Sequence, residues 1–489
     1  MTVNTRVRYV VMVGMAVWMA VAAAGSVAGG PPAAVQPVGR AVAAAVVTQR
    51  QSIPAAAFVP GLGLGMDYEN EGRYLTNLGA ATGSYYTAVR LPQGSRVTRF
   101  TFYWYDTLVG VGPAAMLTYT PWDSGGTTVN MARAVPALVD APGYGSTSDA
   151  TITDSVIDNA QRGYWVVWAL PASADVRGCG VVIEYTPPAA ADSHFALSAA
   201  AFTPYEDGYD YTLDGESVHH KHSPGGGTAA GSYVAPVRLP DGATVTKMTF
   251  HWLDNSSTGQ AKARLQRTEF GQGDLQDMAY AESSLSGTSG ASSSFDSSIN
   301  LATIDNLRYG YWVGWDLSAD DRVGGRGVVI EYQAPGGESG VISSPAAPLK
   351  PSRDGMDYED HGRYVFQKSG PAGKYVAALR LPDGATMGRV TFHWYDNSVS
   401  EQARASLRRT AYGLGNFVAL ASADSALQDA PGYGSSTDTS ITYPTLNNGS
   451  FGYWVQFELP PTAEVRACGV VVELGRWVFL PVIARNAVW

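Results

Sequence analysis

The chain has little cysteine, little charge and no helical patterning. Only Cys179 and Cys468 occur in 489 residues, and two cysteines make at most one bridge, so a disulfide framework is excluded. Charged residues make up 16% of the chain and hydrophobic ones 45%, which excludes a disordered polar chain. The net charge of −10 excludes a basic footprint for nucleic acid as the design of the whole chain. No segment carries a sustained apolar stripe at i, i+3, i+4 and i+7.

The motifs of several enzyme classes are also missing. The sequence contains no G-x-S-x-G, no H-E-x-x-H, no G-x-x-x-x-G-K-[ST] and no C-x-x-C. We therefore expect a protein that is not an enzyme. Because a glycosidase needs only two well-placed carboxylates, a hydrolase without a recognisable motif stays an alternative.

Export is indicated by the N-terminus. Arg6 and Arg8 precede an apolar run from Tyr9 to Gly25, and small residues follow it. This pattern predicts a signal peptide over residues 1–28, cleaved after a small-residue site. A permanent anchor is the alternative, at the short edge of a spanning helix. No later segment approaches that length, so we expect a mature chain without a transmembrane segment, secreted or held at the cell surface.

Three copies of one module make up most of the chain. The copies share a turn, an aromatic strand and a Gly-Tyr-Trp strand, in the same order and at similar spacing: Arg90-Leu91-Pro92, Arg238-Leu239-Pro240 and Arg380-Leu381-Pro382; Phe102-Tyr103-Trp104, Phe250-His251-Trp252 and Phe392-His393-Trp394; Gly163-Tyr164-Trp165, Gly310-Tyr311-Trp312 and Gly452-Tyr453-Trp454. The distance along the chain from one Arg-Leu-Pro motif to the next is longer than the repeat unit of a solenoid protein. Each copy should therefore be a whole domain. The predicted boundaries are 1–28 signal peptide, 29–56 Ala/Pro-rich lead-in, 57–186, 195–333 and 354–474 for the modules, and 475–489 apolar tail.

Within a module the hydrophobic pattern has a period of two, which is typical of half-buried strands. Phe100, Phe102 and Trp104 should face the core, and Pro-x-Gly before them is turn chemistry. In a general way the modules resemble the jelly-roll repeats of bacterial secreted and cell-surface proteins. With that resemblance, the sequence predicts an all-β chain of three tandem antiparallel β-sandwich domains.

Two polar clusters could hold a metal ion. His219, His220 and His222 occur in the second copy alone, and imidazoles at this spacing could share a transition metal. The acidic loops Asp67 to Glu71 and Asp357 to Asp360 could bind Ca²⁺ or supply an acid/base pair, although the calcium-loop spacing is missing. In both cases the alternative is a solvated loop, and we expect no cofactor.

The outer face of the Gly-Tyr-Trp strand is the predicted binding surface. Trp165, Trp312 and Trp454 stand on a face whose other members turn polar, and Tyr103, His251 and His393 occupy the outer position of the aromatic strand. Such rings could stack a sugar or pack a protein partner. Alternatively, a loop or the next module covers them.

These observations predict a non-catalytic, secreted or cell-surface protein with a structural or adhesive role. Its alternatives are a carbohydrate-binding protein that uses the outer Trp faces and a secreted hydrolase with an unrecognised carboxylate pair. The expected partner is a glycan or another surface protein, since linked weak sites gain avidity.

Overall fold

The structure is a computed structural model, and it describes residues 48–61, 66–122, 127–136, 143–188, 193–206, 208–222, 230–270, 274–284, 290–335, 340–412, 414, 416–425 and 432–475. Residues Val46–Trp489 form one compact unit. The predicted signal peptide, most of the lead-in and nearly all of the C-terminal tail lie outside the described residues. Among the described residues, no helix has the length and apolar character needed to cross a membrane.

Each sequence repeat builds two antiparallel sheets, one of six strands and one of five. In the first repeat the six-stranded sheet consists of β1 (Gln49–Pro54), β3 (Tyr68–Asn70), β4 (Leu75–Asn77), β6 (Arg96–Asp106), β9 (Gly143–Asp149) and β11 (Ser173–Thr186). Its five-stranded sheet consists of β2 (Val59–Pro60), β5 (Gly83–Ala88), β7 (Ala114–Pro121), β8 (Val129–Ala134) and β10 (Arg162–Leu170). The short 3₁₀ helix η1 (Ala55–Ala57) joins β1 to β2.

The second and third repeats follow the same order. The second has β12 (His194–Ser198), β14 (Asp210–Leu213), β15 (Val218–His222), β17 (Thr244–Asp254), β20 (Ala291–Asp296) and β22 (Val323–Gln333), then β13 (Thr203–Pro204), β16 (Gly231–Val237), β18 (Ala261–Glu269), β19 (Leu275–Glu282) and β21 (Tyr309–Leu317), with η2 (Ala199–Ala201). The third has β23 (Val341–Pro345), β25 (Tyr358–Asp360), β26 (Val365–Gln367), β28 (Met387–Asp396), β31 (Gly432–Asp438) and β33 (Val465–Leu474), then β24 (Lys350–Pro351), β27 (Gly373–Ala378), β29 (Arg404–Ala411), β30 (Phe417–Asp424) and β32 (Phe451–Leu459).

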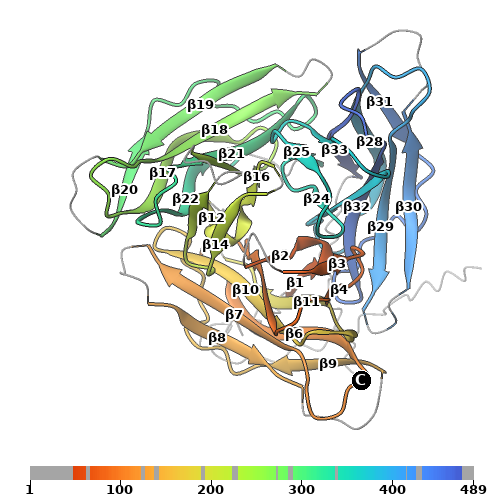
Figure 1. Ribbon diagram of the computed structural model, residues 1–489, viewed down its shortest axis with the longest axis horizontal. Coiled ribbons are helices and arrows are strands. Elements are labelled where there is room, and N and C mark those ends of the chain that lie inside the picture. The colour runs from red at the N-terminus through yellow and green to blue at the C-terminus, as the bar shows by residue number, and fades with distance from the viewer. Residues whose placement is uncertain are drawn as a thin grey trace, which may run out of the picture. The chain divides into compact units, whose positions relative to one another are not determined.

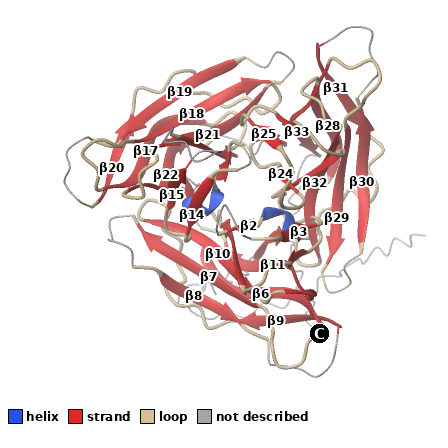
Figure 2. Ribbon diagram, in the orientation of Figure 1, coloured by secondary structure: helices blue, strands red, loops and turns tan. Residues whose placement is uncertain are grey.

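The six sheets stand in a closed ring, which is the arrangement of a six-bladed β-propeller (Figures 1 and 2). The prediction of three tandem jelly-roll β-sandwich domains, and the resemblance on which it drew, are therefore wrong. The two sheets of a repeat enclose a common core, but each sheet also packs against the neighbouring repeat: β10 contacts β12, β21 contacts β23, and β32 contacts β1. The last contact joins the third repeat to the first and closes the ring.

The error has a physical cause. The period of two separates the faces of a strand correctly: Phe100, Phe102 and Trp104 are buried in the core of the first repeat, as predicted. The period of two does not show which part of the protein covers the strand face that points away from the core. The lead-in 29–56 contains β1 and the stretch between the second and third predicted modules contains β23, and with β12 these strands extend the six-stranded sheets. With η1 and η2 they bring consecutive repeats into contact.

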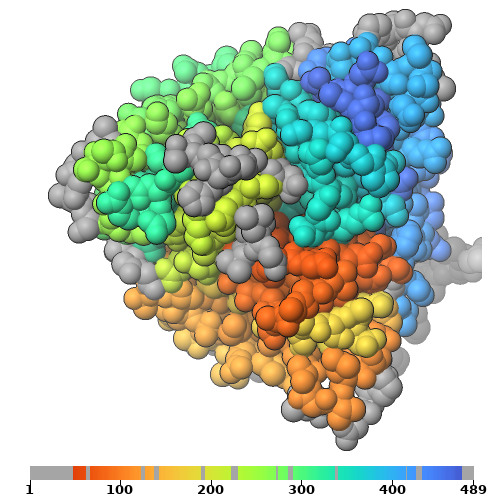
Figure 3. All heavy atoms as spheres, in the orientation of Figure 1, coloured from red at the N-terminus to blue at the C-terminus, as the bar shows by residue number. Residues whose placement is uncertain are grey.

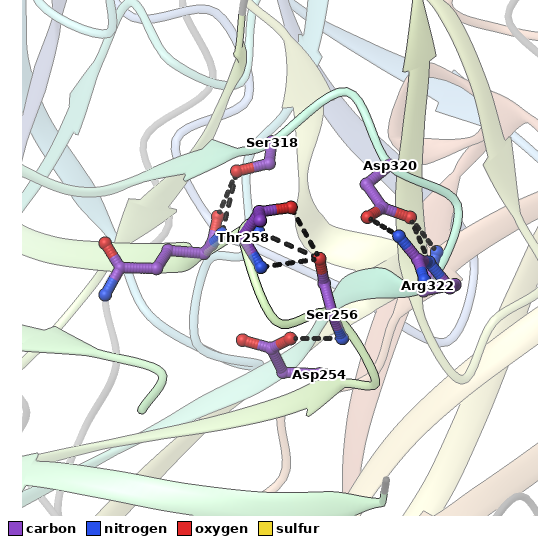
Figure 4. Close-up of polar contacts among 8 residues, drawn as sticks. Asp254, Ser256, Thr258, Ser318, Asp320 and Arg322 are labelled. Carbon is purple, nitrogen blue, oxygen red and sulfur yellow. Dashed lines mark hydrogen bonds and ion pairs between the residues drawn. The ribbon is translucent and has the colours of Figure 1, made fainter. Parts of the chain in front are cut away.

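Turn residues end the aromatic strand of the second repeat. Asp254 is the last residue of β17, and its Oδ1 accepts the Ser256 amide at 2.9 Å (Figure 4). The Ser256 hydroxyl oxygen then accepts the amides of Thr258 and Gly259. Asp320 and Arg322 form a separate ion pair nearby, at 2.8 Å. This cluster satisfies its own donors, so we interpret it as turn chemistry.

The Pro-x-Gly turns place the arginine of the Arg-Leu-Pro motif. Gly94 and Gly384 have φ near +80°, which glycine adopts without a Cβ penalty. In the first copy the Ser95 amide donates to the Pro92 carbonyl oxygen at 3.1 Å, and the turn leads into β6. Each arginine therefore sits between the end of one strand and a tight turn, close to the ring axis.

Candidate functional site

The three predicted outer-face tryptophans lie between repeats. Trp165 packs beside Ala200 of η2, Trp312 beside Ala347, and Trp454 beside Ala56 of η1. Their exposed fractions are 5%, 5% and 0%. The next repeat therefore covers each ring.

The other three predicted aromatic residues also lie at repeat boundaries. Their stacked partners come from neighbouring repeats: Tyr103 with Tyr412 at 4.6 Å, His251 with Trp122 at 4.7 Å and His393 with Phe270 at 4.5 Å between ring centroids. Burial lowers the pKa of His251 to about 3 and that of His393 to about 4. Both imidazoles are therefore neutral stacking groups at pH 7.

The three histidines that were predicted to hold a metal, His219, His220 and His222, lie on strand β15. His220 is fully buried, and its Nδ1 lies 3.0 Å from the Tyr233 hydroxyl, whereas the Nε2 of His219 lies 2.7 Å from the Ser217 hydroxyl. Successive strand residues point to opposite faces, so His219 and His220 do not converge. No group of three His, Cys, Asp or Glu side chains suited to a metal occurs among the described residues. Cys179 and Cys468 are buried free thiols.

A cavity of about 60 Å³ opens near the ring axis, and we call it the axial mouth. It is built where the first segments of the three repeats meet, and Figure 3 shows these segments, in red, yellow-green and teal, side by side near the centre of the molecule. Its walls carry tyrosines, methionines and charged side chains: Met66, Tyr68, Glu206, Tyr209, Tyr211, Lys350, Arg353, Asp354, Met356, Tyr358 and Asp360. The acidic loops of the first and third repeats thus contribute to the mouth.

The carboxyl groups of the mouth are held in different environments. Burial, with the charge of Asp67, raises the pKa of Asp354. Asp360 is fully buried, and burial raises its pKa well above the usual range. Its Oδ1 accepts the Gly362 amide at 2.8 Å, while Oδ2 has no hydrogen-bond partner among the residues that the structure describes. A carboxyl so placed is stable as the neutral acid.

A hydrogen-bonded chain borders the mouth between the second and third repeats. Lys368 pairs with Glu359 at 3.2 Å, Glu359 accepts from Nε2 of His361 at 2.9 Å, and Nδ1 of His361 contacts the Tyr205 hydroxyl. Burial raises the pKa of Tyr205 and lowers that of His361. The phenol is thus held neutral, which does not suit a nucleophile, and the chain joins two repeats.

A second axial cavity, the arginine chamber, has a volume of about 40 Å³. The arginine of each Arg-Leu-Pro motif lines it, and Lys350 lines both the chamber and the mouth. The remaining walls are mostly small: Ala56, Ala57, Thr87, Ala88, Ala200, Ala201, Pro236, Pro348 and Ala378. The two cavities are therefore neighbours along the axis.

Sequence reasoning did not identify the arginine chamber. Arg90, Arg238 and Arg380 were used only as markers of the repeat. The available signal was a basic residue retained at the same turn of all three copies, in a chain where charge is scarce. The acidic loops were noticed, but spacing alone could not place them beside Arg353 and Lys350.

Comparison with known proteins gives no family. No family model and no curated protein matches the chain. The N-terminal CBM22-1-CBM22-2 tandem domain of Xyn10C from Paenibacillus barcinonensis is 10% identical, with a TM-score of 0.21 over 57% of this chain and 93% of that one. Two Listeria monocytogenes structures have TM-scores of 0.20: the uncharacterized protein lmo2446 at 10% identity, and the cycloalternan-forming enzyme in complex with pentasaccharide substrate at 13%. Each covers 82% of this chain, which spans only 31% of theirs. Similarities at this level carry no argument about activity.

Proposed function

We propose that the chain is a non-catalytic, secreted glycan-binding protein whose ligand enters the axial mouth. One observation carries the proposal: all three repeats converge there on a hollow that combines tyrosine rings with carboxyl groups and a guanidinium. Binding sites are typically concave and largely apolar, with a few polar groups that fix orientation. Attachment to a glycan is the form of adhesion that we propose for this protein.

The chemistry of the mouth suits a sugar. Tyr68 and Met66 keep part of their surface accessible and offer apolar contact to the C–H face of a ring. Glu206 and Arg353 supply acceptors and donors for hydroxyl groups. The mouth also explains why the buried tryptophans need not bind ligand.

A direct test compares glycan binding by the whole secreted chain, two mouth variants and a control variant. Arg353→Ala removes a guanidinium from the mouth, Glu206→Gln replaces a carboxylate there with a neutral amide, and the control Arg404→Ala removes an exposed arginine from β29. We expect a glycan array to give hits, and calorimetry on a hit to show at least tenfold weaker binding for both mouth variants. Arg404→Ala should bind normally.

Two results would contradict the proposal. The absence of any hit on a broad array would remove glycans as the ligand class. Equal affinity of the native chain and both mouth variants would move the site elsewhere. Cleavage of a bound glycan, lost on changing a mouth carboxylate, would instead revive the hydrolase alternative.

A further inference from the structure

The arginine chamber concentrates positive charge at the centre of an acidic protein. The chain has a net charge of −10, yet Arg90, Arg238, Arg380 and Lys350 line one cavity. No carboxylate occurs among the described residues that line it. The volume of about 40 Å³ exceeds the roughly 10–15 Å³ that one water needs.

Contacts across repeat boundaries hold the guanidinium groups in place. Arg238 donates from Nη2 to the Ala378 carbonyl oxygen at 2.9 Å and to the Ser344 hydroxyl at 3.0 Å. Arg380 donates from Nη2 to the carbonyl oxygen of Ala88, the residue of the first repeat equivalent to Ala378. Arg238 and Arg380 thus follow a cyclic pattern around the axis, each donating to a carbonyl oxygen of the next repeat.

Arg90 departs from this pattern. Its guanidinium carbon lies 5.2 Å from the centroid of the Phe195 ring, in the second repeat. This stacking orients the group while leaving its donors available. Arg90 is therefore also held by a contact with the next repeat, although through an aromatic ring and not through a carbonyl oxygen.

Several donors in the chamber have no acceptor. Nε of Arg90, Nε of Arg238 and Nη1 of Arg380 are buried without a hydrogen-bond partner in the described structure. None of these arginines, nor Lys350, forms an ion pair with a described residue. Buried donors are normally satisfied, and buried charges are normally paired.

The electrostatics show how unfavourable the unpaired chamber is. Burial lowers the pKa of Arg380 to about 9, that of Arg238 to about 10 and that of Lys350 to about 7, and the neighbouring cations add to the effect at Arg380 and Lys350. Guanidinium groups nevertheless stay protonated in proteins. Asp360 interacts with Lys350 from the mouth, but its own burial favours the neutral acid. The chamber is therefore electrostatically suited to an anion.

We propose that the arginine chamber binds one tetrahedral oxyanion, phosphate or sulfate, on the ring axis. Three guanidinium groups around a pseudo-threefold axis match three oxygens of a tetrahedral anion, because each planar fork can donate to an oxyanion. Lys350, present in the third repeat alone, provides a further donor on the side of the mouth. A planar carboxylate has only two oxygens, which are too few to accept hydrogen bonds from the three guanidinium groups and the Lys350 ammonium together. The site does not depend on glycan binding in the mouth.

Calorimetry tests the site with inorganic ions alone. The native chain is titrated with sodium sulfate and with sodium phosphate, in chloride buffer of constant ionic strength. We expect one site per chain, and at least tenfold weaker binding for Arg380→Gln. Arg389→Gln, which changes an arginine on β28 whose side chain is 52% exposed, should leave the affinity unchanged. No saturable binding of either ion, or equal loss in both variants, would overturn the proposal.

Crystallography separates loss of the site from loss of the fold. Co-crystals of the native chain with selenate, a heavier tetrahedral analogue of sulfate, should show one anomalous peak among the three guanidinium groups. A peak only elsewhere, or none, would refute the site whatever the variant does. Arg380→Lys keeps the charge and loses the planar fork, so it should bind sulfate more weakly than the native chain while melting at a similar temperature.

A third titration identifies the source of the anion. A sulfated monosaccharide and its unsulfated parent are compared with inorganic sulfate. If the ester binds in competition with sulfate, the chamber accepts a sulfate group carried by a sugar in the mouth. If only the inorganic ion binds, the chamber holds free oxyanion. Because inorganic sulfate is the probe in the first experiment, failure of every glycan would not affect this result.

Discussion

At the scale of single residues, Asp360 breaks the pattern of its own repeat. The equivalent residue of the first repeat is Asn70, whose Nδ2 donates to the Ala55 carbonyl oxygen at 2.9 Å and whose Oδ1 accepts the Gly72 amide at 3.0 Å. Asp360 reproduces the second bond to Gly362, but its Oδ2 has no hydrogen-bond partner in the part of the chain that the structure describes. An amide should therefore fit this position better than a carboxylate.

We predict that Asp360→Asn stabilises the protein by about 1–3 kcal/mol at pH 7, the usual cost of an unsatisfied buried polar group. The folded-state pKa of Asp360 is raised, so above pH 4 the folded state holds a proton that the unfolded state has lost. The free energy of unfolding therefore falls as pH rises from about 4. The gain from Asp360→Asn should accordingly be larger at pH 7 than at pH 4, as chemical denaturation would show. A loss of stability at pH 7 would mean that Asp360 is ionised and neutralises Lys350.

Lys350 should give the ring a pH-dependent stability of the opposite sign. Burial and the charges of Arg90 and Arg380 lower its pKa to about 7, against the attraction of Asp360. Above about pH 7 the folded state therefore binds fewer protons than the unfolded state, so stability rises with pH. Asp360 contributes the opposite slope in both proteins, so we predict that from pH 6.5 to 9 in chloride buffer the melting temperature of the native chain rises relative to that of Lys350→Met. Parallel profiles for the two proteins would place the titration elsewhere.

At the scale of elements, a glycine turn of each repeat receives a tryptophan of another repeat. A Cβ on Gly72 would lie 2.4 Å from the Trp454 ring, and the same contact recurs between Gly215 and Trp165 and between Gly362 and Trp312. The glycines have φ between +70° and +87°. Both the backbone conformation and the close approach therefore require glycine.

The pair Gly72→Ala and Gly384→Ala separates these two requirements. Gly384 has a similar φ of +79° but nothing within 4 Å of its Cβ position. We expect Gly384→Ala to cost about 1–2 kcal/mol from the left-handed conformation alone. Gly72→Ala should cost about 1–3 kcal/mol more, because the rigid Trp454 ring must move. Equal losses in urea unfolding would mean that the ring yields without cost.

Strand-level structure was largely predictable, whereas the partners of the outer faces were not. Phe102, Trp104 and Trp168 are buried where the alternation places them. Trp165 has the same residue type on the opposite face, and nothing in its own strand shows that Ala200, in the next repeat, covers it. The arginine chamber could not be predicted for the same reason, because each repeat contributes only one of its several arginines to it. The hydrophobic period of two describes the two faces of one strand. The arginine chamber forms only when the three repeats pack together in the ring.

At the scale of the whole molecule, the ring is held by one type of boundary used three times. Between the third and first repeats, Asn448 donates from Nδ2 to the Arg50 carbonyl oxygen at 3.0 Å, and Tyr412 stacks on Tyr103. The other boundaries have the same kind of contact, with Asn159 and Asn306 donating to the backbone of the following repeat. The third boundary differs because no chain connection crosses it.

A circular permutant tests this closure. Seven residues separate β11 from β12, and seven separate β22 from β23. If the boundaries are equivalent, a copy of residues 187–193 should join Leu474 to Gln49, with new termini opened between Thr186 and His194. Seven residues span at most about 25 Å, which is too short to connect the ends of three domains in a row. We expect the permutant to be monomeric, to melt within a few degrees of the native chain and to bind sulfate with the native affinity.

The matched control carries the same cut with a flexible linker of about 30 residues, whose length costs little additional closure entropy. Folding of the control alone would show that the first and third repeats do not meet, and the arginine chamber would then lose one of its walls.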